Sequence, residues 1–340
     1  MNYLRIIIIG FAIVILPYML NSCGDTGVTP TPKVTGITVS NLATLNTYAD
    51  GYYEAWVSFN ESAGDHGDAA YRTMGKFNVK TDGSLVDPNG NAFSLNAARF
   101  TDLNKIEDAI ISVELPGDND TILNGTKILG ALKSNENEEL VFHLSMSYSH
   151  ILGAIADNLL NATAKYILAT PSDTSGNPNR YKRGAWYTQD TLGQSLGLTV
   201  SQISDTLDWK YQAWLFDGRD TIKWRYDMGK FNGPNEQDNF QQCQIFVPSW
   251  TKPGQDWTIP NCPRGNAPDP PDITDLTTDG RYILVITLEP KIESLGLAWP
   301  FQLVLFHGRI PSSFSYGQIE QLNNTVKLPT GEIRLAYATK

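Results

Sequence analysis

Cys23 is the residue whose setting in the sequence most directly indicates a chemical reaction. It follows Leu20, Asn21 and Ser22, and further back an apolar run over residues 6–16 that is preceded by Arg5. A charged start, a short apolar segment and small residues before a cysteine are typical of a bacterial lipoprotein signal, in which the cysteine is lipidated and the preceding segment is removed. We therefore predict a signal peptide over residues 1–22 and a mature chain that begins at a lipid-bearing Cys23.

The alternative interpretation of this segment is a single transmembrane helix that is never cleaved. A spanning helix needs about 20 apolar residues, and this run is about half as long. It also ends at Pro17. Gly24 follows the cysteine in place of the aspartate that typically retains proteobacterial lipoproteins at the inner membrane. We expect the protein at the outer membrane, on its periplasmic face or at the cell surface, with membrane lipid as a partner through Cys23.

The other two cysteines, Cys243 and Cys262, form an even pair in an exported protein, which indicates one disulfide. Such a bond closes a loop of about 20 residues and stabilises the fold by about 3 kcal/mol in the chain-entropy model. A metal site is the alternative, but the histidines lie far from this pair and from one another, without the spacing of zinc ligands. The histidines are His66, His143, His150 and His307. We expect no metal and no cofactor.

Glu114 and Glu289 are the carboxylates that would have to lie about 5 to 10 Å apart to catalyse glycoside hydrolysis. They occupy corresponding positions of an internal repeat, so we expect them in different modules, each accepting hydrogen bonds from the turn after its strand. Residues 65–68 and 118–120 are rich in oxygen ligands but lack the spacing of a calcium loop, and we expect solvated turns there. The sequence has no serine-hydrolase, zinc-protease or phosphate-loop motif. We therefore predict that the protein is not an enzyme.

Trp250 and Trp257 are the candidate contact residues, because they lie within the loop that the disulfide would close, among three prolines. An aromatic side chain on a constrained loop loses little entropy on binding. We therefore predict that this loop is a binding surface. The alternative is that both indoles fold back and cover the edge of a sheet.

An internal repeat organises the elements that position these residues. The recurring blocks are the segments 53–57 and 211–215, 74–78 and 228–232, and 111–116 and 286–290. Each block alternates apolar and polar residues and is bounded by Gly, Asn, Asp or Pro, which is typical of a strand. Residues 149–160 have apolar residues at helical spacing. The sequence therefore predicts an all-β chain of two tandem β-sandwich-like domains with one short helix, after a cleaved lipoprotein signal peptide.

The repeat also predicts the domain boundaries. A flexible tether over residues 23–33 follows the signal peptide, and then come a first β-sandwich module (34–145), a connecting segment packed with the modules (146–205) and a second β-sandwich module (206–340), whose disulfide-closed insertion spans 233–279. The formal net charge of -10 repels phosphate backbones, so we expect no nucleic-acid partner.

The repeated blocks resemble the extracytoplasmic domain of anti-sigma-K-type factors, a β-sandwich family with a Tyr-x-x-Trp strand, a Gly-x-Phe strand and a Glu-Pro turn. The residues that carry the resemblance are Tyr53, Trp56, Gly75, Phe77, Glu114 and Pro116 in the first copy and Tyr211, Trp214, Gly229, Phe231, Glu289 and Pro290 in the second. The resemblance implies a module that senses or contacts something outside the membrane. Regulators of that family carry a cytoplasmic sigma-binding segment and a spanning helix before the sandwich, and here a lipoprotein signal occupies that place.

The sequence as a whole favours a lipid-anchored, non-enzymatic cell-envelope protein used for binding or sensing, with an envelope protein or a glycan as partner. An envelope hydrolase acting on glycan or peptide is the first alternative. A regulatory sensor that signals through a separate membrane protein is the second. For the repeated Trp and Tyr residues we expect a structural role, because two copies of a module need the same core.

Overall fold

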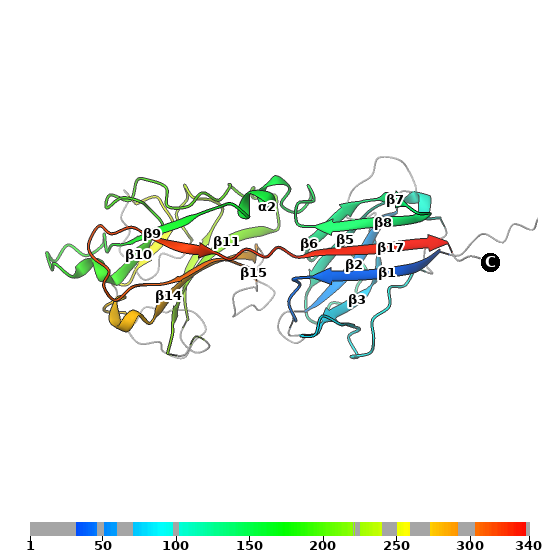
Figure 1. Ribbon diagram of the computed structural model, residues 1–340, viewed down its shortest axis with the longest axis horizontal. Helices are drawn as coiled ribbons and strands as arrows, with labels where there is room; N and C mark the ends of the chain where they lie inside the picture. Colours follow the sequence, from blue (N-terminus) through cyan, green and yellow to red (C-terminus); the bar gives the residue numbers. More distant parts are fainter. Residues whose placement is uncertain are drawn as a thin grey trace, which may run out of the picture.

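The computed structural model describes residues 32–45, 51–59, 71–97, 102–219, 221, 225–239, 250–258, 273–291 and 303–337. The predicted signal peptide, lipidation site and disulfide pair (Cys23, Cys243 and Cys262), together with the 65–68 loop, lie outside these residues. The described part of the chain is mostly β and forms two curved sheets (Figure 1). The all-β prediction of two modules with a short helix is therefore confirmed.

The first sheet is a half-barrel with the strand order β1-β17-β8-β6-β5-β2-β3-β4, and β7 pairs with β8. Its strands are β1 (Pro32–Ser40), β2 (Tyr52–Phe59), β3 (Tyr71–Val79), β4 (Leu85–Val86), β5 (Ile106–Glu114), β6 (Thr126–Leu132), β7 (Ser134–Glu136), β8 (Glu139–Ser145) and β17 (Thr330–Tyr337).

The second sheet has the strand order β12-β11-β14-β15-β16-β9-β10-β13. Its strands are β9 (Ala164–Leu168), β10 (Gly184–Trp186), β11 (Trp209–Asp217), β12 (Arg225–Phe231), β13 (Gly254–Asp256), β14 (Tyr282–Pro290), β15 (Leu303–Arg309) and β16 (Glu320–Asn324). The two edge strands, β12 and β13, contact each other, so this sheet is a nearly closed barrel.

The helical elements are short. The α-helix α2 spans Ala154–Leu159, within the segment predicted to be helical, and the 3₁₀ turns are η2 (Leu103–Lys105), η3 (Arg180–Arg183) and η4 (Thr278–Gly280). Among the described residues, no helix combines the length and the hydropathy that a membrane span requires.

The internal repeat corresponds to strands β2, β3, β5 and β6 in the first sheet and to β11, β12, β14 and β15 in the second. The register is the same in both: Trp56 lies opposite Ile110, and Trp214 lies opposite Val285. A bulge interrupts the first strand pair of each copy beside the tryptophan. Near this bulge, Gly75 and Gly229 have φ angles of +131° and +96°, which glycine adopts without the steric cost of a Cβ.

The topology corrects the predicted domain boundaries. β17, near the end of the chain, leaves the second module and inserts between β1 and β8 of the first sheet, where Ile333 and Leu335 are buried in the core. β9 and β10, in the predicted connecting segment, are strands of the second sheet. β8 and β1 would otherwise each have an unpaired edge, and β17 satisfies both with backbone hydrogen bonds.

Candidate functional site

The repeated tryptophans make the same buried contact in both modules. Trp56 Nε1 donates to Ser112 Oγ at 2.8 Å, and Trp214 Nε1 donates to Thr287 Oγ1 at 2.9 Å. Both indoles are buried. A polar atom on a buried ring needs such a partner, because leaving it unpaired in the interior is costly. Since the contact recurs in both copies, it belongs to the packing of the module, as expected from the repeat.

A second repeated contact holds the bulge of each module. In the first copy, Thr73 Oγ1 donates to Glu54 Oε1 and accepts the backbone N–H of the bulge glycine at 3.1 Å. In the second copy, Asp227 Oδ1 accepts from Gln212 Nε2 at 2.9 Å and from the equivalent glycine N–H at 2.7 Å. The hydrogen-bonding pattern is the same in both copies, but the carboxylate belongs to the first strand of the pair (β2) in the first copy and to the second strand (β12) in the second copy.

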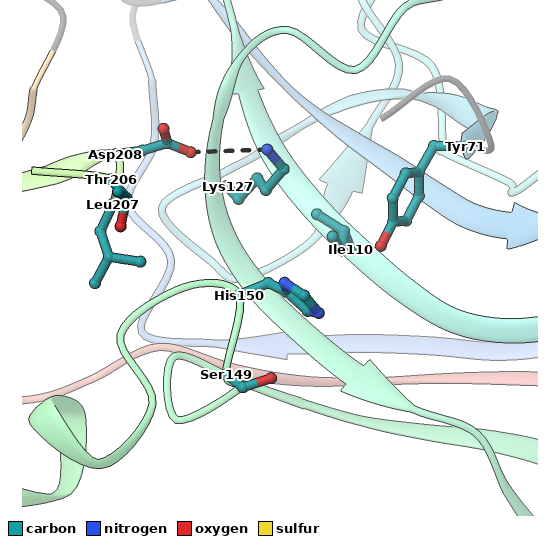
Figure 2. A pocket seen from close by; sticks show the side chains of 8 residues that line it. All are labelled: Tyr71, Ile110, Lys127, Ser149, His150, Thr206, Leu207 and Asp208. Atoms are coloured by element: carbon teal, nitrogen blue, oxygen red, sulfur yellow. Dashed lines mark ion pairs between the residues drawn. The ribbon is translucent and has the colours of Figure 1, made fainter. Parts of the chain in front are cut away.

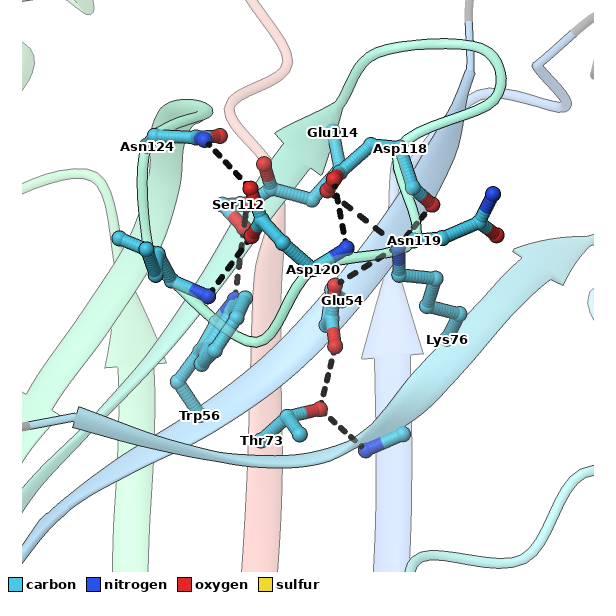
Figure 3. Close-up of polar contacts among 12 residues, drawn as sticks. Glu54, Trp56, Thr73, Lys76, Ser112, Glu114, Asp118, Asn119, Asp120 and Asn124 are labelled. Carbon is cyan, nitrogen blue, oxygen red and sulfur yellow. Dashed lines mark hydrogen bonds and ion pairs between the residues drawn. The ribbon is translucent and has the colours of Figure 1, made fainter.

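Because Glu54 stands where the second module has a glutamine, the first module contains a group of buried acidic side chains (Figure 3). Lys76 Nζ lies 3.6 Å from Glu54 Oε2, and it donates to the backbone oxygen of Asp118 at 2.5 Å and to its carboxylate at 3.3 Å. Glu114 is fully buried beside them, and its Oε1 accepts a hydrogen bond from Ser112. Lys76 thereby ties strand β3 to the loop between β5 and β6.

The burial of these carboxyl groups changes their ionisation. Desolvation, together with the neighbouring charge of Glu54, raises the pKa of Glu114 to about 7, despite the hydrogen bond from Ser112. Desolvation likewise raises the pKa of Glu54, against the hydrogen bond from Thr73 and the charge of Lys76. Glu114 Oε2 has no hydrogen-bond partner among the described residues. The protonated form of Glu114 is therefore the one that its surroundings favour.

The predictions for the acidic residues are met in part. Glu114 ends β5 of the first sheet and Glu289 lies near the end of β14 of the second sheet, so they belong to different modules, as expected. The expected hydrogen bonds to Glu114 from the following turn are wrong, because its observed partner, Ser112, precedes it on the same strand. The 118–120 turn is stabilised by its own aspartates, with Asp118 accepting the Asp120 N–H at 3.0 Å. Over the described residues, no group of three or more His, Cys, Asp or Glu side chains is placed to hold a metal ion.

The binding-loop prediction for Trp250 and Trp257 needs correction. Trp250 is 7% exposed and packs edge-on against Trp186 at 4.9 Å, and Trp257 is 1% exposed and packs against Tyr226 at 6.3 Å between ring centroids. Both tryptophans flank β13, which pairs with β10 in the second sheet. The alternative, in which the indoles cover the sheet, is the one that the structure bears out.

A cavity of about 350 Å³ lies at the junction of the two modules (Figure 2). The residues that line it come from the first module and from the segment that enters β11: Tyr71, Ile110, Lys127, Ser149, His150, Thr206, Leu207 and Asp208. Lys127 reaches across the junction toward Asp208, with 3.9 Å between Nζ and Oδ2. This volume falls at the lower end of the range for small-molecule pockets. We name this cavity the junction pocket.

A buried carboxylate positions one wall of the junction pocket. Asp108 Oδ2 accepts hydrogen bonds from Tyr71 at 2.7 Å and from Tyr148 at 2.5 Å. Burial and the hydrogen bond to Asp108 raise the pKa of Tyr148, so this phenol stays protonated and donates to the carboxylate. The oxygen of the pocket-lining Tyr71 is therefore oriented toward Asp108.

Comparison of the two copies shows that the residues which position the wall of this pocket are not shared by the second module. In the second copy, Arg225 and Ile283 occupy the register positions of Tyr71 and Asp108. The fold therefore does not require the phenol–carboxylate pair. Neither residue stands in a recognisable motif, so they were missed by the sequence analysis. A position-by-position comparison of the repeat copies would have indicated them.

Comparison of the whole chain with protein-family models, with curated proteins and with solved structures gave no match.

Proposed function

We propose that this protein is a lipid-anchored, non-enzymatic component of the bacterial cell envelope that binds a small polar ligand between its two modules. The observation that carries the proposal is the junction pocket, whose lining combines residues from both sides of the junction. Pockets between domains are preferred sites for small ligands. A ligand held there contacts both modules at once, which would couple its binding to their relative position and so support a sensing role.

The lining favours an uncharged ligand rich in hydroxyl groups, such as an envelope sugar. Lys127 and Asp208 neutralise each other as an ion pair. Ser149, Thr206 and His150 supply side chains that donate and accept hydrogen bonds. Glu114, the carboxyl group with a pKa near neutrality, is not among the residues that line this pocket, and the proposal gives it a structural role.

Saturation-transfer NMR of the full-length protein with a panel of neutral envelope sugars, including glucose and N-acetylglucosamine, tests the proposal. Ser149 is exposed at the pocket, so Ser149→Trp fills the space without disturbing the core. Ser313→Trp is the matched control, because Ser313 is equally exposed and lies outside the pocket. We expect a sugar signal that Ser149→Trp abolishes and Ser313→Trp retains. A panel without any signal, or a signal that survives in Ser149→Trp, would refute binding in this pocket.

The anchor is proposed from the sequence around Cys23 and has its own test. Mass spectrometry of the protein isolated from bacterial membranes should find a mature N-terminus at a diacylated or triacylated Cys23. We expect Cys23→Ser to leave the signal segment attached and unlipidated. An unmodified Cys23 in the wild-type protein would contradict the anchor without bearing on the pocket.

A further inference from the structure

A buried aspartate gathers arginine side chains at the end of the second module. Asp217 ends β11 and is fully buried. Arg219 donates to both of its carboxylate oxygens, from Nε at 3.1 Å and from Nη2 at 2.6 Å. Arg281 Nε lies 3.3 Å from Asp217 Oδ2. The two guanidinium groups therefore meet on one carboxylate.

A third arginine approaches the same turn from β15. Arg309 Nη1 donates to the carbonyl oxygen of Gly280 at 3.3 Å, and it lies 3.2 Å from the point where a Cβ on Gly218 would stand. Gly218 is the residue between Asp217 and Arg219, so its missing side chain leaves room for this approach. We name Arg219, Arg281 and Arg309 the arginine cluster.

The cluster is held in position by contacts besides the carboxylate. Arg281 Nη2 donates to Tyr282 Oη at 2.9 Å, and its guanidinium lies 4.8 Å from the centre of the Tyr282 ring. The side chain of Arg219 is 45% exposed, and Arg309 is exposed. Charged groups that are already fixed in position lose little entropy when a ligand binds to them.

The first module shows that the fold does not need these charges. The positions that correspond to Asp217, Arg281 and Arg309 are occupied there by Phe59, Ile106 and Leu132. Cations also lie at this place in the half-barrel, with Arg72 and Lys105 at 4.4 and 5.8 Å from the centre of the Phe59 ring, but no carboxylate stands at these three positions. The buried aspartate with its paired arginines is therefore an addition to the shared framework.

The charge of the cluster opposes that of the chain. The protein has a formal net charge of -10, yet here two guanidinium groups meet on one buried carboxylate and a third, that of Arg309, lies on the adjacent Gly280 carbonyl oxygen, with Asp279 of η4 as an exposed acidic neighbour. A local concentration of positive charge attracts anions at short range, where it outweighs more distant, screened charges.

We propose that the arginine cluster is a binding site for a phosphate group. Guanidinium groups pair with phosphate oxygens through two parallel N–H donors, and several arginines suit its double charge. This site lies in the second module and phosphate binding there does not depend on the junction pocket, whereas the choice between sources of phosphate rests on the proposed lipid anchor. The phosphate comes from a lipid headgroup or from a soluble or glycan-borne phosphate ester.

The placement of the cluster favours a ligand that is not part of the protein's own anchoring membrane. η4, drawn in gold beside the cluster, lies at the opposite end of the elongated molecule from the start of β1 and the C-terminal end of β17 (Figure 1). β1 begins at Pro32, so its first two residues fall within the predicted tether of residues 23–33. The turn that carries the cluster therefore lies at the far end of the body from the point at which the tether joins it.

Isothermal titration calorimetry of the full-length protein with inorganic phosphate, at constant ionic strength, tests the site. We expect saturable binding that Arg309→Gln weakens by about tenfold or more, the effect of losing one charge-assisted interaction. Arg219→Gln should also weaken phosphate binding. With two variants, the site can still be tested if one of them folds poorly. Arg72→Gln, an exposed arginine of the first module, is the matched control and should leave binding unchanged.

A second arm distinguishes the sources of phosphate. The full-length protein is anchored in phosphatidylcholine vesicles and mixed with vesicles that contain phosphatidylglycerol, and glucose 1-phosphate is titrated separately. Vesicle clustering that Arg309→Gln abolishes supports a lipid headgroup, whereas glucose 1-phosphate binding without clustering supports a soluble or glycan-borne ester. Absence of saturable phosphate binding, or an equal loss in Arg72→Gln, would overturn the proposal.

Discussion

Trp209 and Lys127 join the two modules directly: the indole Nε1 of Trp209 donates to the backbone carbonyl oxygen of Lys127 at 2.9 Å. Trp209 begins β11 of the second sheet and is buried, and Lys127 lies on β6 of the first sheet. The side chain of Lys127 pairs with Asp208, the residue before Trp209. One residue of the first module thus contacts two consecutive residues that lead into the second, beside the junction pocket.

Removal of this hydrogen bond should loosen the junction. Trp209→Phe keeps a buried ring but removes the donor, and we expect a loss of about 1 kcal/mol of stability. Scanning calorimetry should show the unfolding transition broadening or splitting into two steps, because the modules become less coupled. Trp214→Phe is the matched control, since its indole bonds within the second module. Identical single transitions in the two variants would contradict a coupling role for Trp209.

The buried acid of the first module predicts a pH dependence of stability. The pKa of Glu114 is raised to about 7 in the folded protein from the ordinary value of 4.5. The folded state therefore binds more protons than the unfolded state between these values, so the stabilising contribution is complete at lower pH and is lost as the pH rises toward 7. Burial also raises the pKa of Asp256 to about 6 and raises that of Glu54, so a Glu114 variant is needed to assign the dependence to Glu114.

Urea denaturation between about pH 6 and pH 8 measures this effect. We expect the free energy of unfolding of the wild type to fall by about 1 kcal/mol over this interval. Glu114→Gln carries no titrating proton at this position and should show a flatter profile, with a relative gain in stability at the upper end. A slope that persists unchanged in Glu114→Gln would assign the dependence to another group.

Glu54→Gln should lower the pKa of Glu114, because it removes the neighbouring charge that helps to raise it. The substitution also reproduces the second module, where Gln212 stands at this position. Carbon-detected NMR of the glutamate carboxyl groups would report the titration midpoint. Glu107→Gln is the control, since Glu107 pairs with Lys133 elsewhere on β5. An unchanged midpoint in Glu54→Gln would show that burial alone determines it.

Trp250→Ala and Trp257→Ala should each destabilise the fold by about 3 to 5 kcal/mol, as expected for the truncation of a buried tryptophan. The earlier hypothesis of a binding loop instead requires a nearly unchanged melting temperature with loss of partner capture. Thermal denaturation decides between them. Tyr316→Ala removes an aromatic ring that is 67% exposed and should change the melting temperature little. Equal melting temperatures across the three variants would restore the binding-loop hypothesis.

Gly130→Ala should disturb the wall of the junction pocket. A Cβ at this position would lie 2.3 Å from Tyr148 Cδ1, so the ring that bonds to Asp108 must move. We expect a destabilisation of about 1 to 3 kcal/mol, typical of overpacking, and weaker binding of any sugar that the NMR panel identifies. Gly36→Ala is the control, because a Cβ there meets nothing within 4 Å. Unaltered binding in a folded Gly130→Ala protein would exclude the Asp108 network from the site.

Local sequence pattern was sufficient to predict the architecture at the level of its modules. Alternation of apolar and polar residues identifies strands because successive side chains of a strand point to opposite faces. The repeat identifies corresponding strands because two copies of one module need the same buried residues, as Trp56 and Trp214 illustrate. Both properties are expressed within a few consecutive residues, so a sequence displays them without knowledge of the fold.

Tertiary structure alone decided which strands are partners and which residues meet. The pattern of β17 is compatible with either sheet, and its place between β1 and β8 depends on backbone edges formed by residues far away in the chain. The junction pocket joins Tyr71 to Asp208, which no local motif connects. The indole of Trp250 is amphipathic and suits a surface as well as a core. Such outcomes depend on long-range packing, whose free energy arises only when distant segments exclude water together.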